Sequence, residues 1–159
     1  MKRWRSATAS NSGFPEALAL AHRHLRHRDR FVSEIEAFLR EAGLAEHRQA
    51  VVDRLLAQGV LHDERVAQAW ADQALDKKGW PLTRVRAALE ERGAAPEAVE
   101  SALAGRGDDG EVAGELLSEG LAGGDPPARV ARRLIARGFD PDCVADVLAA
   151  AGFGPGEGA

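Results

Sequence analysis

The sequence predicts an all-α fold built from three tandem three-helix repeats, and three features of the chain support this. Most apolar residues are Ala, Leu or Val, and Tyr is absent, so helix formers outnumber strand formers. Apolar residues recur at three- and four-residue spacing, as helices that pack by one face require. Glycines and prolines stand where helices are expected to end and begin. Outside the repeats, residues 1–13 and 153–159 are expected to be a disordered arm and a disordered tail.

The first unit is expected over residues 14–60. Pro15 stands near the start of its first helix, and Gly43 and Gly59 end the second and third helices. Proline suits a first helical turn because the amide proton that it lacks would have no partner there. The apolar stripes of these helices consist of Leu18, Ala21, Leu25, Val32, Ile35, Phe38, Leu39, Val51, Val52, Leu55 and Leu56.

The second unit is expected over residues 61–105. Asp63 is predicted to cap the fourth helix, because its carboxylate can accept hydrogen bonds from the free amides of the first turn. Gly79 ends that helix, and Pro81 and Pro96 open the fifth and sixth helices. The residues expected to face the interior are Val66, Trp70, Ala74, Val85, Leu89, Val99 and Leu103.

The third unit is expected over residues 106–152 and begins within a flexible acidic bridge at 105–110. Asp140 is predicted to cap the ninth helix, and Pro141 suits the position that follows the cap. The residues expected to face the interior are Val112, Leu116, Leu117, Leu121, Val130, Leu134, Val144 and Leu148.

The second and third units repeat each other. A shift of 45 residues aligns Gly79 with Gly124 and continues through Pro81 and Pro126, Arg84 and Arg129, Val85 and Val130, Leu89 and Leu134, Arg92 and Arg137, Gly93 and Gly138, Pro96 and Pro141, Val99 and Val144, and Leu103 and Leu148. One extra residue aligns Val66 with Val112. In a weaker copy, the first unit places Ile35, Leu39 and Gly43 where the second has Val85, Leu89 and Gly93. Because about 45 residues rarely bury enough apolar area to fold alone, neighbouring units are expected to stack into an elongated array that can curve.

Arginines recur on the polar side of the matched helices. At about 100° per residue, the eighth helix places its arginines on one side and its apolar residues on the other. The arginines are Arg129, Arg132, Arg133 and Arg137, and the apolar residues are Val130, Ala131, Leu134 and Ile135. A sparser basic set in the second unit consists of Lys77, Lys78, Arg84, Arg86 and Arg92. These nine residues are the predicted partner-binding set, for an acidic surface or a phosphate backbone; a plain solvated face is the competing interpretation.

Composition excludes several classes of protein. The formal net charge of −4 argues against a protein whose affinity comes mainly from covering phosphates with Lys and Arg. The sequence contains no apolar run of about eighteen residues, so no transmembrane helix is expected. A single cysteine cannot form a disulfide within the chain, which favours a reducing, cytoplasmic location.

No residue pattern predicts catalysis, a cofactor or a small-molecule substrate. The sequence has no Walker loop, GxSxG, HExxH or Gly-rich turn between a strand and a helix. His22, His24 and His27 suggest a metal site, but only His24 and His27 share a helix face, and no acidic or thiol ligand stands beside them. Cys143 takes the place of Ala98 in the second unit and is interpreted as a small core residue rather than a nucleophile.

The segment Gly59–Gly93 resembles the RecX family, the regulatory proteins that act on the RecA recombinase, and the resemblance extends over about Leu18 to Leu148. The family pattern is Gly-Leu-Leu-Asp-Asp-x-x-Phe-Ala, followed by Lys/Arg-Gly-x-x-x-x-Arg-Ile-x-x-x-Leu-x-x-Lys/Arg-Gly. The residues that fit it are Leu61, Asp63, Ala67, Lys78, Gly79, Arg84, Val85, Leu89, Arg92 and Gly93. The sequence departs from the family at His62, Val66 and Ala94, where acidic, aromatic and branched aliphatic residues are usual.

The resemblance implies three tandem three-helix repeats, a cytoplasmic protein, and binding in the groove of a RecA filament on single-stranded DNA. It also implies modulation, usually inhibition, of the filament's ATPase, strand-exchange and coprotease activities in DNA repair, recombination and the SOS response. The family has no catalysis or cofactor of its own.

Two alternative functions stay open at this point. Three-helix units with a tight Gly turn are also typical of helix-turn-helix proteins, whose second helix enters the major groove of duplex DNA without RecA. A helical-repeat scaffold for another protein is equally consistent with the repeats.

Overall fold

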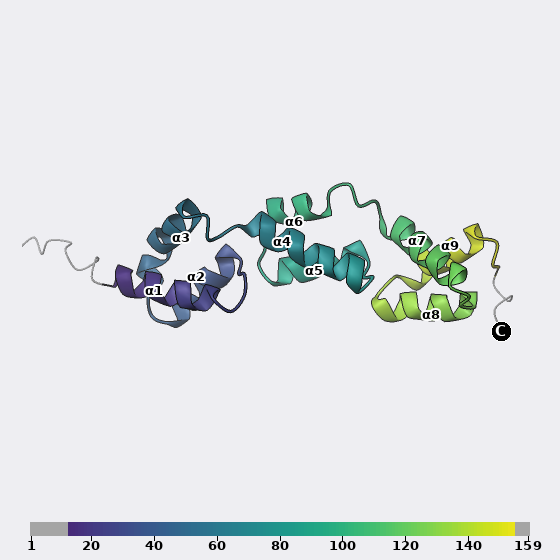
Figure 1. The fold of residues 1–159 in the computed structure, drawn as a ribbon, viewed down its shortest axis with the longest axis horizontal. Helices are drawn as coiled ribbons and strands as arrows, with labels where there is room; N and C mark the ends of the chain where they lie inside the picture. Colours follow the sequence, from purple (N-terminus) through teal and green to yellow (C-terminus); the bar gives the residue numbers. More distant parts are fainter. Residues whose placement is uncertain (1–12, 155–159) are drawn as a thin grey trace, which may run out of the picture.

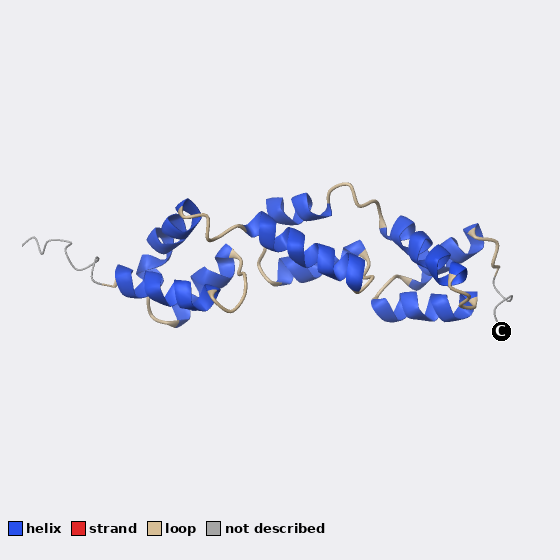
Figure 2. Cartoon of the chain, viewed as in Figure 1, coloured by secondary structure: helices blue, strands red, loops and turns tan. Residues whose placement is uncertain are grey.

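The computed structural model describes residues 13–154, and every regular element in that range is a helix (Figures 1 and 2). The predicted all-α class is therefore confirmed. Most of the predicted arm and tail, residues 1–12 and 155–159, lie outside the described residues. The elements are α1 (Phe14–Leu25), α2 (Val32–Glu41), the short 3-10 helix η1 (Ala45–His47), α3 (Arg48–Ala57), α4 (Asp63–Asp72), the π-helical turn η2 (Gln73–Lys77), α5 (Leu82–Glu91), α6 (Pro96–Leu103), α7 (Asp109–Ala122), α8 (Pro127–Arg137) and α9 (Pro141–Ala150).

The helices form three groups that follow one another along an elongated molecule (Figure 1). We call α1 to α3 the first group, α4 to α6 the second group and α7 to α9 the third group. The main helix-to-helix contacts lie within these groups, and each group surrounds a hydrophobic cluster. The buried residues of the three clusters include Ile35, Leu39, Val51 and Leu55 in the first, Val66, Val85, Leu89 and Val99 in the second, and Leu117, Val130, Leu134 and Val144 in the third.

Two residues that were assigned to the apolar stripes are largely exposed. Leu56 exposes 47% of its surface and Ile135 exposes 45%. Each follows a fully buried leucine, Leu55 or Leu134, and so lies about 100° around the helix from it. In a bundle of only three helices, each helix buries a narrow face, so the edge of the apolar stripe stays in water.

Prolines and aspartates begin the later helices as the sequence predicts. Pro96 is the first residue of α6 and Pro141 the first of α9. The Asp140 side chain caps α9 by accepting hydrogen bonds from the amides of Asp142 at 2.8 Å and Cys143 at 3.3 Å. These local signals hold because a cap needs only residues within its own turn.

The boundaries around α4 and α7 differ from those predicted. Asp63 is not the cap of α4; it is the first helical residue and its carboxylate accepts a hydrogen bond from the Val32 amide at 2.8 Å. The helix continues past Asp72 into η2, which ends at Lys77, close to the predicted end at Gly79. The expected bridge at 105–110 is partly helical, because Asp108 caps α7 and the helix begins at the next residue.

Candidate partner-binding surface

The first and second groups meet at a contact that we call the first joint. Phe31, just before α2, is fully buried in the hydrophobic cluster of the second group. The Val32 amide donates to Asp63, and the Ser33 hydroxyl donates to the Gly93 carbonyl at 2.6 Å. The first turn of α2 is therefore fixed to the start of α4 and to the end of α5.

The second and third groups meet at the second joint in a corresponding way. The Thr83 hydroxyl donates to the Asp109 carboxylate at 2.6 Å, and the Thr83 amide donates to the same carboxylate at 3.3 Å. Arg84 Nη1 donates to the Arg137 carbonyl oxygen at 2.6 Å. The first turn of α5 is therefore fixed to the start of α7 and to the end of α8, which repeats the pattern of the first joint.

Two of the five predicted binding residues in the second group are paired with acids inside the chain. Arg86 forms an ion pair with Glu100, and hydrogen bonding from Arg86 lowers the pKa of the Glu100 carboxyl. Arg92 Nη2 lies 3.4 Å from the Glu34 carboxylate, and its guanidinium lies 4.9 Å from the centre of the Phe31 ring. These two cations therefore have acidic partners before any other molecule binds.

Lys78 and Arg84 lie against the ring of Trp80, in the turn before α5. Arg84 Cζ is 3.8 Å and Lys78 Nζ is 4.7 Å from the ring centre, both within the range of cation–π attraction. The Trp80 ring also meets Trp70 edge to face, with 5.9 Å between their centres. This turn therefore carries two exposed cations on an aromatic side chain, next to the exposed Lys77.

Two of the four α8 arginines share one carboxylate. Arg133 Nη1 lies 2.6 Å and Arg129 Nη1 lies 3.4 Å from Asp125. Hydrogen bonding, from Arg133 above all, lowers the pKa of the Asp125 carboxyl. Within residues 13–154, Arg132 and Arg137 have no ion-pair partner. Of the α8 set, these two arginines carry charges that no acid of the described chain offsets; Arg132 is exposed and Arg137 is half-buried.

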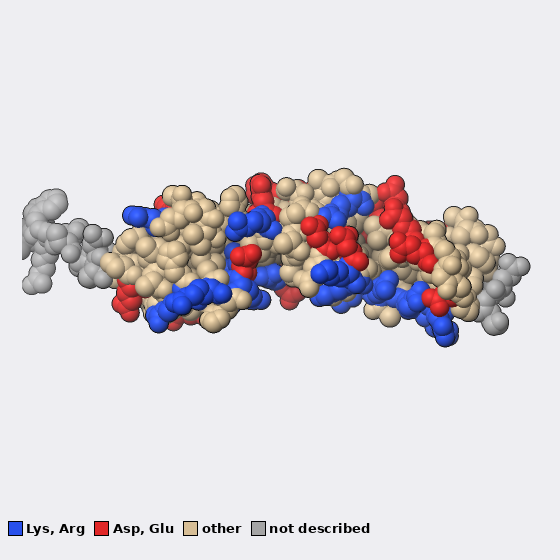
Figure 3. Space-filling model, viewed as in Figure 1, with Lys and Arg blue, Asp and Glu red and all other residues tan. Residues whose placement is uncertain are grey.

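Figure 3 shows Lys and Arg side chains along one edge of the molecule, over α5 and α8, while Asp and Glu gather over α7. The structure brings three of the predicted residues together at the second joint. Lys78 and Arg84 share the Trp80 ring, and the Arg137 guanidinium lies against Gly79, where an added Cβ would be only 2.8 Å from Nη1. A basic surface therefore crosses from the second group to the third.

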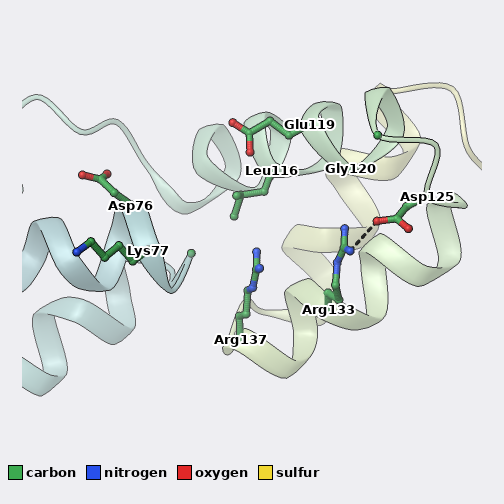
Figure 4. A pocket seen from close by; sticks show the side chains of 10 residues that line it. Asp76, Lys77, Leu116, Glu119, Gly120, Asp125, Arg133 and Arg137 are labelled. Carbon is green, nitrogen blue, oxygen red and sulfur yellow. Dashed lines mark ion pairs between the residues drawn. The ribbon is translucent and has the colours of Figure 1, made fainter.

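A cavity of about 350 Å³ lies beside the second joint, between η2 and the helices α7 and α8. In Figure 4, Arg137 rises from α8 toward this cavity, and Arg133 is paired with Asp125. The charged lining residues are Asp76, Lys77, Glu119, Asp125, Arg133 and Arg137. Because acids and bases line it in equal number, the cavity does not select a ligand of either sign.

The histidine and cysteine candidates have structural surroundings. The His24 ring stacks on Phe38, with 4.1 Å between ring centres and 5° between planes. Residues 13–154 contain no group of three or more His, Cys, Asp or Glu side chains placed to hold a metal ion. Burial, with nearby acids, raises the pKa of the Cys143 thiol, which opposes formation of a nucleophilic thiolate. None of the helices in residues 13–154 is long and apolar enough to cross a membrane.

Sequence reasoning did not identify the acidic partners of the predicted basic residues. Asp125 stands four residues before Arg129, a spacing that places side chains together on a helix, so this pair was detectable. Glu34 lies 58 positions from Arg92, and no local pattern joins residues so far apart.

Comparisons with known proteins support the fold. No protein-family model matches the sequence, and no curated protein matches it. A crystal structure of RecX from Lactobacillus salivarius is similar with a TM-score of 0.66 and 16% sequence identity, over 86% of this chain and 95% of that chain. A crystal structure of a regulatory protein RecX is similar with a TM-score of 0.65 and 17% identity, over 89% of this chain and 74% of that chain. At this level of identity, the similarity is one of fold.

Proposed function

We propose that this chain, which has the fold of RecX, is a non-enzymatic regulator that binds RecA filaments on single-stranded DNA and inhibits their ATPase, strand-exchange and coprotease activities. The main support for this proposal is the similarity of fold to RecX over 86% of the chain. The RecX-like residue pattern in Gly59–Gly93 is a second support. In this proposal the protein acts in the cytoplasm, in recombination, DNA repair and the SOS response. The filament is its partner, and single-stranded DNA is reached through the filament.

The basic edge of α5 and α8 supports this proposal. The whole chain carries a net charge of −4, so its attraction to an acidic polymer must come from a local surface rather than from total charge. Lys77, Lys78, Arg84, Arg132 and Arg137 supply such a surface across two helical groups. An elongated molecule can contact several subunits of a filament at once, so modest individual contacts are sufficient.

Inhibition requires that the protein prefer one state of the filament over another. A bound molecule shifts an equilibrium only by the difference between its affinities for the two states. We propose that the basic edge docks on the filament conformation that hydrolyses ATP slowly. The three groups, held in line by the two joints, then span neighbouring subunits and oppose the change to the active state.

The test adds this protein to RecA filaments already formed on single-stranded DNA. Slower ATP hydrolysis is expected, together with retention of the protein by the DNA-bound recombinase of its host in a pull-down. The same DNA without recombinase is the control. An unchanged hydrolysis rate at saturating protein, with no retention, contradicts the proposal.

The same experiment with duplex DNA distinguishes the proposed function from the helix-turn-helix alternative. That alternative requires duplex binding without RecA and a steep loss of affinity as salt rises. In α8 two of the four arginines are already paired with Asp125, which weakens the helix as a groove reader. We expect negligible binding to duplex DNA at moderate salt. Retention of the protein by an unrelated protein alone would favour the scaffold alternative.

A further inference from the structure

The two joints share their construction but differ in charge. In the first joint, the Glu34 carboxylate lies among three arginines from two groups, 3.4 Å from Arg28 Nη2, 3.9 Å from Arg30 Nη1 and 3.4 Å from Arg92 Nη2. The Glu34 side chain exposes only 17% of its surface. This carboxylate therefore links the first group to the end of α5 by charge as well as by the hydrogen bonds described above.

The second joint retains the outer cations and lacks the carboxylate. The alignment of the first and second units places Ile35 on Val85. The alignment of the second and third units places Gly93 on Gly138. The matched pairs are Arg28 and Lys78, Glu34 and Arg84, and Arg92 and Arg137. A basic residue therefore occupies the central position that an acid occupies in the first joint.

The contacts of the second joint support this correspondence. Arg84 reaches the end of α8 through its bond to the Arg137 carbonyl, as Glu34 reaches the end of α5. In the described chain, no carboxylate lies within ion-pair distance of Lys78, Arg84 or Arg137. Asp76 and Glu119 line the adjoining cavity but do not pair with these cations. The Asp109 carboxylate of this joint bonds Thr83 and not these cations. Like charges gathered without an ion-pair partner favour an anion from outside.

We propose that the second joint binds a carboxylate group, supplied by an aspartate or glutamate side chain of a protein partner, beside Arg84, which holds the position of Glu34, and near Lys78 and Arg137. The internal copy indicates the chemistry, because the first joint fills the equivalent position with a carboxylate. A planar carboxylate also matches the hydrogen-bonding fork of a guanidinium. When bound, it links the second group to the third and fixes their relative orientation. The site consists of this chain's residues and does not depend on the partner being RecA.

The test measures binding of a small carboxylate to the full chain by NMR. The probe is glutarate, whose ends resemble a glutamate side chain, with chloride used to keep the ionic strength constant. The Nε–H signals of Arg84 and Arg137 and the indole N–H signal of Trp80 are followed. We expect saturable shifts of all three signals in glutarate and none in chloride.

Two variants and a matched control locate the site. Arg84→Glu supplies the carboxylate within the chain, as in the first joint, so glutarate affinity is expected to fall by about tenfold or more, the loss of one charge-assisted hydrogen bond. Arg137→Gln is expected to weaken binding to a similar degree. Arg65→Gln, which changes an exposed arginine of α4 outside the basic edge, is expected to leave the affinity unchanged.

Several results would overturn the proposal. Glutarate shifts that do not saturate, or that Arg65→Gln weakens as much as Arg137→Gln does, would indicate general attraction to positive charge. Saturation by inorganic phosphate but not by glutarate would assign the site to phosphate groups instead. Because the recombinase is absent from this experiment, its outcome and that of the filament test are independent.

Discussion

The Asp63 carboxylate accepts a hydrogen bond from the Val32 amide at 2.8 Å, across 31 positions of the sequence. The same kind of residue at the start of α7, Asp109, accepts from Thr83 in α5. Each aspartate therefore satisfies a free amide of a helix in the preceding group, rather than one in its own helix. These hydrogen bonds therefore help to hold neighbouring groups together at both joints.

Replacing Asp63 by alanine is expected to lower the free energy of unfolding by about 0.5–2 kcal/mol, because the Val32 amide loses its acceptor. Urea denaturation monitored by circular dichroism measures this. Glu64→Ala is the matched control, since Glu64 is an exposed residue of the same turn without a hydrogen bond to the first group. Equal effects of the two variants would contradict a capping role for Asp63.

Gly93 is expected to tolerate a side chain less well than Gly43. Both have positive φ, 81° and 76°, so Gly→Ala strains the backbone at either site by about 1 kcal/mol. At Gly93 an added Cβ would also clash with the Ser33 side chain, whereas the space around Gly43 is open. Thermal unfolding should therefore show a larger loss of stability for Gly93→Ala than for Gly43→Ala. The difference between the two losses measures the cost of disturbing the first joint. Combining Gly93→Ala with Ser33→Gly should remove most of that difference.

Glu34→Gln is expected to lower the free energy of unfolding by about 1–2 kcal/mol, because the variant loses charge-assisted contacts with three arginines at a half-buried site. The loss should shrink as salt is added, since ions screen the partly exposed charges. Glu36→Gln, on the same helix and without an ion pair, serves as the reference in salt-dependent denaturation. A loss that is independent of salt would mean that Glu34 acts by packing alone.

Asp125 predicts a specific dependence of stability on pH. Hydrogen bonding from Arg133 and Arg129 lowers the pKa of this carboxyl below its ordinary value of 3.8. Because the folded state holds the carboxyl in its charged form, Asp125 stabilises the fold at pH values above the ordinary pKa. This contribution to the free energy of unfolding is lost as the pH falls through the lowered pKa of the folded state. Asp125→Asn should therefore be less stable than the native chain at pH 6, and the difference should narrow toward pH 3. A difference of the same size at pH 6 and pH 3 would contradict this role of Asp125.

Reversing the charge of Lys77 and Arg132 together is expected to weaken filament binding several-fold without lowering the melting temperature. Both residues are exposed and have no ion pair in the described chain, and each exposed charge contributes about 0.2–1 kcal/mol. The matched control reverses Arg54 and Arg65, exposed arginines of α3 and α4. If both double variants lose the same affinity, net charge rather than the basic edge governs binding.

The sequence was sufficient to predict the helices and most of the core. Residues such as Leu39, Val85 and Leu134 repeat at helical spacing and are fully or almost fully buried. Caps such as Asp140 depend on neighbouring residues only, so their local pattern is reliable. The sequence also indicated that the basic residues of α5 and α8 form one set, although it did not distinguish paired from unpaired members.

The tertiary structure decided which charges are available and how the groups are joined. Arg92 is paired with Glu34 and Arg133 with Asp125, whereas Lys78, Arg84 and Arg137 gather at the second joint and pair with no acid of the described chain. Hydrophobic periodicity records which face of a helix is buried, so one sequence suffices to predict it. A joint depends on side chains from helices that are distant in the chain, and only folding determines which of them meet.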